Sequence, residues 1–515
     1  MGCSSVENVN KVINISIPRK YTIIQTIYID KSFPHENTSI FGIDNLNKIN
    51  KGEEIPYQKN YNILIKDFKE NQIIWKRIDE IFNNKKYILF PDKITSNSII
   101  QGTIGNCYFL TVITSLIKYP SLLYQLFNNN LSISQNGHYE INLKINKKIS
   151  TIHLDDYFPY NTRKSKPVFC KPYNNEIWVM LLEKAWAKIK GSYFGMDIGS
   201  PIEVLNAFLL SSDLKKDILY KFYSLKNSDD KNEIWNIMMN KIKNNNIFMI
   251  CLSKENLKDK KKLNNLYYSI VEKHFYNIID VYTNEGKNIL KLRNPWGFNL
   301  KNKNYKNIEN DIDFIIEENN NDLDSNNTSM NNGEFEIDFN YFCYLFEEIQ
   351  VYEIKKFSIN INCILKHDKI KFNLVYLNIK EKLKAPIKVK IILDAKICHI
   401  DNKYLDFKFL IIEKERMNII YKKNHKIDLK SSKFEFDLIS FSNNSNIYYL
   451  FFVYSFDLNN LENINIKTIF QSDDYFELIN YHHYYDDKRL EEVLKNEFLK
   501  YNIKINSLEY KEKIF

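Results

Sequence analysis

The chain has 515 residues, of which 44% are apolar and 14% aromatic, a composition that supports a globular protein of several domains. Its net charge of +9 arises from 72 basic and 63 acidic residues scattered over nearly every segment, which indicates a solvated surface and no nucleic-acid partner. The 12 glycines are too scattered to form a GxxxxGK phosphate loop or a GxGxxG dinucleotide turn, which excludes nucleotide enzymes of those two kinds.

The N-terminus MGCSSV has no apolar signal region, and the seven cysteines include no CxxC pair, so we expect a reducing, cytoplasmic location without structural zinc. The longest apolar run, at 447–456, is too short to span a bilayer. Gly2 and Cys3 suggest myristoylation followed by palmitoylation, although Val6 holds the position that usually carries Ser or Thr. Membrane association through these two anchors is a hypothesis, and an ordinary disordered N-terminus is its alternative.

The first half of the chain is predicted to be helical. Residues 1–70 carry few strong signals and are assigned to an N-terminal extension. In 71–200, apolar residues recur at helical spacing after Cys107 and again in IWVMLLEKAWAKI at 177–189. The segment GSYFGMDIGSP at 191–201 has the turn chemistry of a boundary.

The second half is predicted to be rich in strands. Region 201–354 contains three alternating runs, of which the last two are joined by a short NEGK turn: IFMICLS, HFYNIIDVYT and NILKLRNPWG. Several short runs in 355–480 indicate an antiparallel sandwich, and 481–515 reads as a helical tail. We therefore predict an α+β fold.

Four residues can form a nucleophilic site. Cys107 falls in the first turn of a predicted helix, where free N–H groups and the helix dipole favour a thiolate. His274 opens a strand whose hairpin partner ends at Asn294, and an even register would place both on one face, so that the amide orients the imidazole of a thiolate–imidazolium pair. Gln101 can aim its amide at an oxyanion, with the Cys107 N–H as second donor.

Each of these residues also has an ordinary structural explanation. A buried cysteine is usually an inert apolar side chain, a single strand histidine is usually structural, and an Asn before Pro is usually a turn residue. Chance assembly of all four is much rarer than the chance occurrence of any one. On these residues alone, a cysteine hydrolase and a set of structural residues are about equally supported.

Six stretches resemble, in order, the calpains, which are papain-like cytosolic cysteine proteases: WKRIDEIF, QGTIGNCYFL, IWVMLLEKAWAKIKGSY, KHFYNIIDVY, LKLRNPWG and NGEFEIDF. The resemblance covers about 33–350 and continues more weakly into the calpain β-sandwich, which is C2-like. It implies a two-lobed protease core with the substrate cleft between the lobes. It further implies that Cys107 is the nucleophile, His274 the general base and Asn294 the residue that orients this base. Gln101 would then donate to the oxyanion, and the indole of Trp296 would shield the His and Asn pair.

The chain departs from the family pattern beside both predicted catalytic groups. Family members usually have Asp and Trp on either side of the cysteine, where this chain has Asn106 and Tyr108. They usually have Gly and Ala on either side of the histidine, where this chain has Lys273 and Phe275. We expect the bulkier pair to reshape the cleft and alter substrate preference more than it alters the triad.

The resemblance also bears on calcium, which conventional calpains bind in each lobe through carboxylate and carbonyl oxygens to draw the lobes together. Most of the expected carboxylates are replaced here, by Ser98, Phe194, Leu300 and Asn332, and Glu334 is the only acidic match. No Gly follows Gly333, so no EF-hand loop can compensate. We expect no required cofactor and no metal ligands, although backbone carbonyls or the acidic insertion around Asp322 remain an alternative calcium site.

The sequence therefore predicts a calpain-like cysteine endopeptidase that performs limited proteolysis of intracellular proteins. One alternative is a catalytically inactive calpain-like scaffold whose sandwich binds proteins or membrane, and the intact Cys, His and Asn weigh against it. A second is an acyltransferase of the transglutaminase kind with a Cys-His-Asp triad, which Asn294 disfavours.

Overall fold

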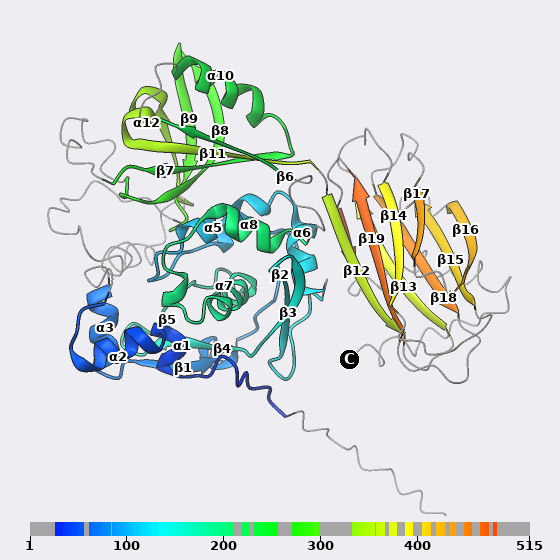
Figure 1. Ribbon diagram of the computed structural model, residues 1–515, viewed down its shortest axis with the longest axis horizontal. Coiled ribbons are helices and arrows are strands. Elements are labelled where there is room, and N and C mark those ends of the chain that lie inside the picture. Colours follow the sequence, from blue (N-terminus) through cyan, green and yellow to red (C-terminus); the bar gives the residue numbers. More distant parts are fainter. Residues whose placement is uncertain are drawn as a thin grey trace, which may run out of the picture.

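The computed structural model in Figure 1 describes residues 26–355, apart from 56–60, 84, 129, 211–217, 226–230, 256–269 and 298–331, and then nine separate strands between 357 and 480. Gly2, Cys3 and the predicted tail at 481–515 lie outside the described residues. The described part combines helices with antiparallel sheets, so the fold is α+β. Within it, no helix is both long and apolar enough to cross a membrane.

The first lobe, residues 26–210, is mainly helical. Its helices are α1 (Asn37–Phe41), α2 (Ile43–Lys51), α3 (Asn62–Lys69), α4 (Ile78–Ile81), α5 (Cys107–Leu116), α6 (Pro120–Tyr124), α7 (Trp178–Ile189) and α8 (Pro201–Phe208), with 3-10 turns η2 (Ser96–Ser98), η3 (Gln125–Phe127) and η4 (Phe194–Met196). Its strands form a sheet of β1 (Ile73–Arg77), β4 (Tyr157–Asn161) and β5 (Lys166–Pro167), and a hairpin of β2 (Tyr139–Ile145) and β3 (Lys148–Leu154).

Both helices predicted from apolar spacing are present, and α5 lies inside the first core. All of its residues except Thr114 are buried, because most are apolar and the hydroxyls of Thr111 and Ser115 donate to carbonyls of the helix itself. The same core contains side chains from the N-terminal helices: the Phe41 ring lies 4.9 Å from those of Phe68 and Phe194. Residues expected to form an N-terminal extension thus help to bury the helix that carries Cys107.

The second lobe, residues 218–354, is built on a six-stranded antiparallel sheet of order β10-β9-β8-β7-β11-β6. Its strands are β6 (Ile218–Ser224), β7 (Ile247–Ser253), β8 (Phe275–Asn284), β9 (Lys287–Arg293), β10 (Glu334–Asp338) and β11 (Phe346–Ile354), with helices α10 (Lys231–Ile242) and α12 (Phe339–Leu345) packed on it. The predicted β8–β9 turn is confirmed, with Glu285 at φ 49° and Gly286 at φ 76°, the left-handed pair of a tight hairpin. This lobe has its own hydrophobic core.

Beyond the lobes, two further antiparallel sheets follow, of orders β12-β19-β14-β17 and β16-β15-β18-β13-β20. The strands are β12 (Phe357–Leu365), β13 (Ile370–Asn378), β14 (Ile387–Asp394), β15 (Tyr404–Glu413), β16 (Ile419–Asp428), β17 (Lys433–Leu438), β18 (Ile447–Ser455), β19 (Ile464–Ser472) and β20 (Glu477–Asn480). Phe357 and Phe470 belong to the core of the first lobe, and the Phe357 ring lies 5.2 Å from that of Tyr119. The four-stranded sheet, which contains both residues, is therefore joined to the first lobe by an apolar contact.

Candidate active site

Cys107 is the first residue of α5, in the first helical turn as predicted, and the residue is only 7% exposed. The backbone N–H groups of Phe275, Tyr108 and Cys107 itself favour the thiolate and act to lower the pKa of the thiol. Burial is the larger effect, because it removes the water that would solvate the anion, and it raises the pKa of the Cys107 thiol to about 11. Phe275 directly follows His274, so the described contacts bring the thiol beside the predicted base.

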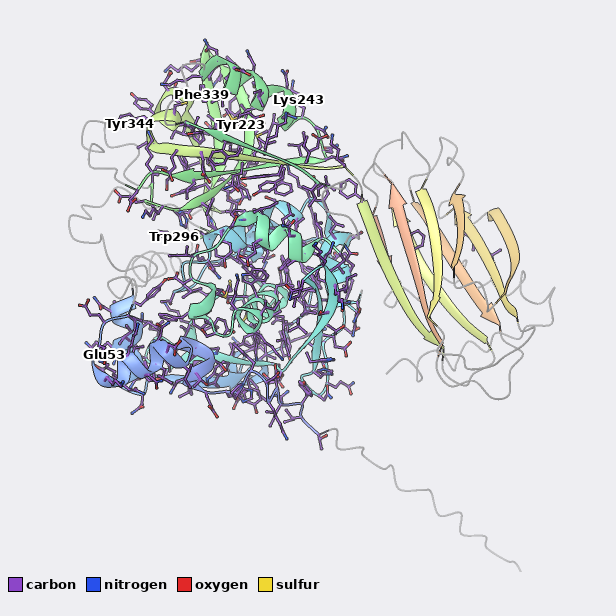
Figure 2. The ribbon with its side chains drawn as sticks, in the orientation of Figure 1. Glu53, Tyr223, Lys243, Trp296, Phe339 and Tyr344 are labelled. Carbon is purple, nitrogen blue, oxygen red and sulfur yellow. The ribbon has the colours of Figure 1, made fainter. Side chains whose placement is uncertain are left out.

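His274 and Asn294 meet as predicted, with 2.9 Å between the imidazole Nε2 and the amide Oδ1. The same amide oxygen accepts the Trp296 backbone N–H at 3.1 Å, which fixes its orientation. Because this oxygen can only accept, we assign the Nε2 proton to His274 and leave Nδ1 free as an acceptor. The Trp296 ring lies 5.2 Å from the imidazole and is buried, and Figure 2 shows Trp296 between the two lobes.

The neighbouring strand β7 holds the backbone of His274. The Ser253 side-chain oxygen accepts the His274 N–H at 2.9 Å, and the Ser253 N–H donates to the His274 carbonyl at 3.1 Å. The ring itself is only 5% exposed, and this burial lowers the pKa of His274 to about 4. Burial thus shifts the two groups in opposite directions, raising the pKa of the thiol and lowering the pKa of the imidazole.

A β-bulge brings His274 and Asn294 to the same face of the sheet. Next to the turn, Asn284 pairs with Lys287, a register that would put His274 and Asn294 on opposite faces if it continued. The register shifts by one between Ile278 and Asp280, where Ile279 is the extra residue, and beyond it Asn277 pairs with Arg293. The side chains of His274 and Asn294 then point the same way. The hairpin was predictable from the sequence, but this bulge was not.

Gln101 is buried and held at two points. Its side-chain Nε2 donates to the Ile104 carbonyl at 2.8 Å, and its backbone N–H donates to the Pro295 carbonyl at 3.2 Å. The second hydrogen on Nε2 remains as a donor, and the Cys107 N–H lies in the first turn of α5, where the helix supplies no acceptor. The predicted pair of oxyanion donors is therefore chemically available.

The residues that flank Cys107 differ from the usual family pattern, and each has found buried partners on α7 that the sequence did not reveal. The Asn106 amide donates to Glu183 at 2.8 Å, and the other Glu183 oxygen accepts the Cys170 N–H at 2.9 Å. The Tyr108 hydroxyl accepts the indole N–H of Trp186 at 3.0 Å and donates to a backbone carbonyl. Glu183, an acid within the mainly apolar first part of helix α7, was the available signal. Burial raises the pKa of Glu183 to about 7.

The two residues that flank His274 affect the site differently: the first is strained in its backbone, and the second packs against the other lobe. Lys273 has φ 50°, the left-handed region in which glycine is favoured, so its backbone is strained where family members usually have glycine. Phe275 is partly buried and packs against the core of the first lobe. The expected reshaping of the site thus consists of a strained residue before the histidine and an aromatic contact between lobes after it.

Two side chains of the second lobe hydrogen-bond to the first. Arg293 is fully buried and donates to the Ser96 and Ile99 carbonyls and to the Thr114 hydroxyl. The Asn277 amide donates to the Thr111 carbonyl at 2.8 Å and to the Ser115 hydroxyl at 2.9 Å. Because Thr111, Thr114 and Ser115 all belong to α5, these contacts fasten the Cys107 helix directly to the hairpin that leads from His274 to Asn294.

The described positions at which the family resemblance implies calcium ligands have other partners. Ser98 donates to Glu176 at 2.5 Å, and the Phe194 ring lies 4.8 Å from that of Tyr61. Glu334 forms an ion pair with Lys291 at 2.6 Å and accepts the Asn332 amide at 3.1 Å. Leu300 lies outside the described residues. An aromatic ring, a hydroxyl and an acid already paired with a cation do not fit a hard divalent ion.

Comparison with known proteins defines the class. A model described as the calpain family cysteine protease matches residues 28–353, more than half of the chain. The chain therefore belongs to the calpain family of cysteine proteases.

Its curated relatives are catalytic subunits and other calpains. The calpain-1 catalytic subunit of Bos taurus is 27% identical over 232 residues, covering 44% of this chain and 30% of that protein. Calpain clp-4 of Caenorhabditis elegans is 26% identical over 243 residues, covering 44% of this chain and 31% of that protein. The Homo sapiens calpain-1 catalytic subunit is 26% identical over 235 residues, covering 44% and 30%. The match spans about a third of the length of these relatives.

Proposed function

We propose that this protein is a calpain-like cysteine endopeptidase that cleaves intracellular proteins at a limited number of sites. The observation that carries the proposal is the bond between His274 and Asn294 beside a cysteine at the first turn of a buried helix. A protein substrate is the class that the family membership supports.

The proposed reaction uses the sulfur of Cys107 as nucleophile and His274 as base. When the substrate carbonyl reaches Cys107, the thiol proton moves to Nδ1 of His274 and the sulfur attacks the carbonyl carbon. The negative charge that develops on the carbonyl oxygen is stabilised by the Gln101 amide and the Cys107 N–H. The imidazolium then gives its proton to the leaving amine, which breaks the peptide bond, and water activated by His274 releases the acyl-enzyme.

Covalent labelling tests this assignment against a non-catalytic scaffold. A peptide carrying an epoxide or vinyl sulfone should label the full chain, and labelling should disappear in Cys107→Ala. Cys343→Ala is the matched control, because Cys343 is another buried cysteine, with no proposed role, and its loss should leave labelling unchanged. Peptide hydrolysis should be nearly abolished in Cys107→Ser and His274→Ala and impaired in Asn294→Ala. Unchanged turnover in Cys107→Ser would exclude the proposed nucleophile.

We further propose that calcium does not switch this enzyme. The support is twofold: the positions expected to bind calcium have other partners, and the hydrogen bonds of Arg293 and Asn277 hold the lobes together. Peptide hydrolysis by purified protein should therefore be similar in chelator and in millimolar calcium. Strong activation that depends on calcium bound in the lobes would contradict the proposal.

Two finer assignments belong with this function. We assign the two sheets between 357 and 480 to a C2-like sandwich, which is supported by their antiparallel four- and five-stranded orders. We also propose that Gly2 and Cys3 carry acyl chains that attach the enzyme to membrane. Fractionation of Gly2→Ala beside the parent chain tests this, and identical soluble fractions would end it.

A further inference from the structure

Three potential metal ligands meet on the β2–β3 hairpin, on elements that contribute nothing to the candidate active site. Nε2 of His138 lies 3.0 Å from Nδ1 of His153, and that Nδ1 lies 3.6 Å from a Glu140 carboxylate oxygen. One ligand atom of each residue lies within 4.8 Å of the other two. Two imidazoles and one carboxylate form a donor set that proteins use for zinc.

The backbone of the hairpin puts these three side chains on one face. Glu140 pairs directly with His153, and directly paired residues of antiparallel strands project to the same side. His138 precedes Glu140 by two residues, so it projects to that side as well. The hairpin turn is tight, with Asn146 at φ 49° and Lys147 at φ 66°. The grouping therefore follows from strand register and does not require a rare arrangement of loops.

The distance between the two imidazoles fits a hydrogen bond between them and fits a shared metal ion as well. The two rings are stacked with an interplanar angle of 19° and their nearest nitrogens 3.0 Å apart. A metal ion bridging both nitrogens needs a similar separation, because tetrahedral bonds of about 2.0–2.1 Å place two ligand atoms roughly 3.3 Å apart.

We propose that His138, Glu140 and His153 form a zinc site on the surface of the first lobe. The two nitrogens and one carboxylate oxygen would supply three ligands and water the fourth. Asn128, whose side-chain amide lies 3.3 Å from a Glu140 oxygen, supports the carboxylate from outside the hairpin. Calcium and magnesium do not fit this set, because they prefer oxygen ligands.

The site would also fasten the N-terminal segment to the hairpin. The Tyr28 ring lies 4.1 Å from that of His138, and the Tyr28 N–H donates to the Asn136 carbonyl at 2.9 Å. An ion that fixes the His138 ring fixes the surface on which Tyr28 rests. We therefore expect zinc to stabilise this edge of the first lobe without entering the proposed reaction.

Zinc titration by calorimetry tests the site in the full chain. The parent for this test carries Cys107→Ser, which removes a thiol that would itself bind zinc. It should bind zinc, and its Tm should rise with zinc and not with magnesium. His153→Asn on this parent should weaken binding at least about tenfold and abolish the Tm rise. Lys148→Asn is the matched control, since it introduces the same residue at an exposed position of the same strand and should change neither result.

A second set of variants separates this site from others. Glu140→Gln keeps the shape of the side chain and should also weaken zinc binding, which provides a test if His153→Asn fails to fold. His482→Asn combined with His483→Asn removes an adjacent histidine pair elsewhere in the chain and should leave the affinity unchanged. Equal zinc affinity in the parent, His153→Asn and Glu140→Gln would overturn the proposal. So would a result in which only the variant that lacks His482 and His483 loses zinc binding.

Discussion

The two sides of the candidate active site are positioned by different kinds of structure. Cys107 is placed by its own helix, whose apolar sequence specifies both its start and its burial. His274 and Asn294 are placed by pairing between two strands, and their common face depends on one extra residue in β8. A position fixed by local sequence tolerates distant change, whereas a position fixed by register can be lost through the insertion of a single residue.

The largest expected effect comes from shifting His274 by one residue relative to Asn294. Inserting an alanine between Tyr276 and Asn277 leaves the pair Asn277–Arg293 in place and should put His274 on the face opposite Asn294. We expect kcat/KM for peptide hydrolysis to fall by about 1000-fold, as expected from loss of a general base. Deleting Ile279, the unpaired bulge residue, keeps the pairs on both sides of it and should leave His274 and Asn294 on one face, so this variant should retain more activity. Full activity of a folded insertion variant would show that strand register does not set the site.

Breaking the bonds between the two sides should mainly affect stability. Arg293→Met removes a buried cation that satisfies two carbonyls and a hydroxyl, and we expect the free energy of unfolding to fall by roughly 4 kcal/mol. Lys291→Met is the matched control on the same strand, because its partly exposed ion pair with Glu334 is worth less than about 1 kcal/mol. Denaturant titration of both variants measures the difference, and equal losses would contradict a special role for Arg293.

The histidine side should also make the protein sensitive to acid. The pKa of His274 is lowered to about 4 from 6.5, so between these values the unfolded chain binds a proton that the folded chain does not. Its contribution to stability is present above pH 6.5 and is lost as the pH falls through about 4. The loss amounts to about 3 kcal/mol. His274→Gln should flatten this part of the curve of unfolding free energy against pH, and parallel curves for parent and variant would refute it.

The features of the site that the sequence predicted are those set by local sequence, and the features it did not predict are set by pairing between strands or by packing between lobes. Cys107 at the start of a helix, the hairpin turn at Glu285 and the pairing of His274 with Asn294 were predicted and are present in the structure. The bulge at Ile279 leaves no clear signal, because bulges arise from pairing between strands and not from one residue type. The effect of burial on the pKa values of the thiol and the imidazole could not be predicted either, since the burial is created by both lobes together.

The smallest expected effect concerns the residue that precedes each proposed catalytic group. Asn106 has an ordinary φ of −101°, whereas Lys273 has φ 50°, so only the histidine side carries this backbone strain. The ion pair between Lys273 and Glu255 is exposed, so it offsets little of the free energy that the backbone strain costs. Lys273→Gly should be about 1 kcal/mol more stable than Lys273→Ala, the reverse of their order in a helix, because both lose the ion pair and only glycine relieves the left-handed conformation. Thermal unfolding of the two variants measures this difference, and an Ala variant at least as stable as the Gly variant would place no strain at Lys273.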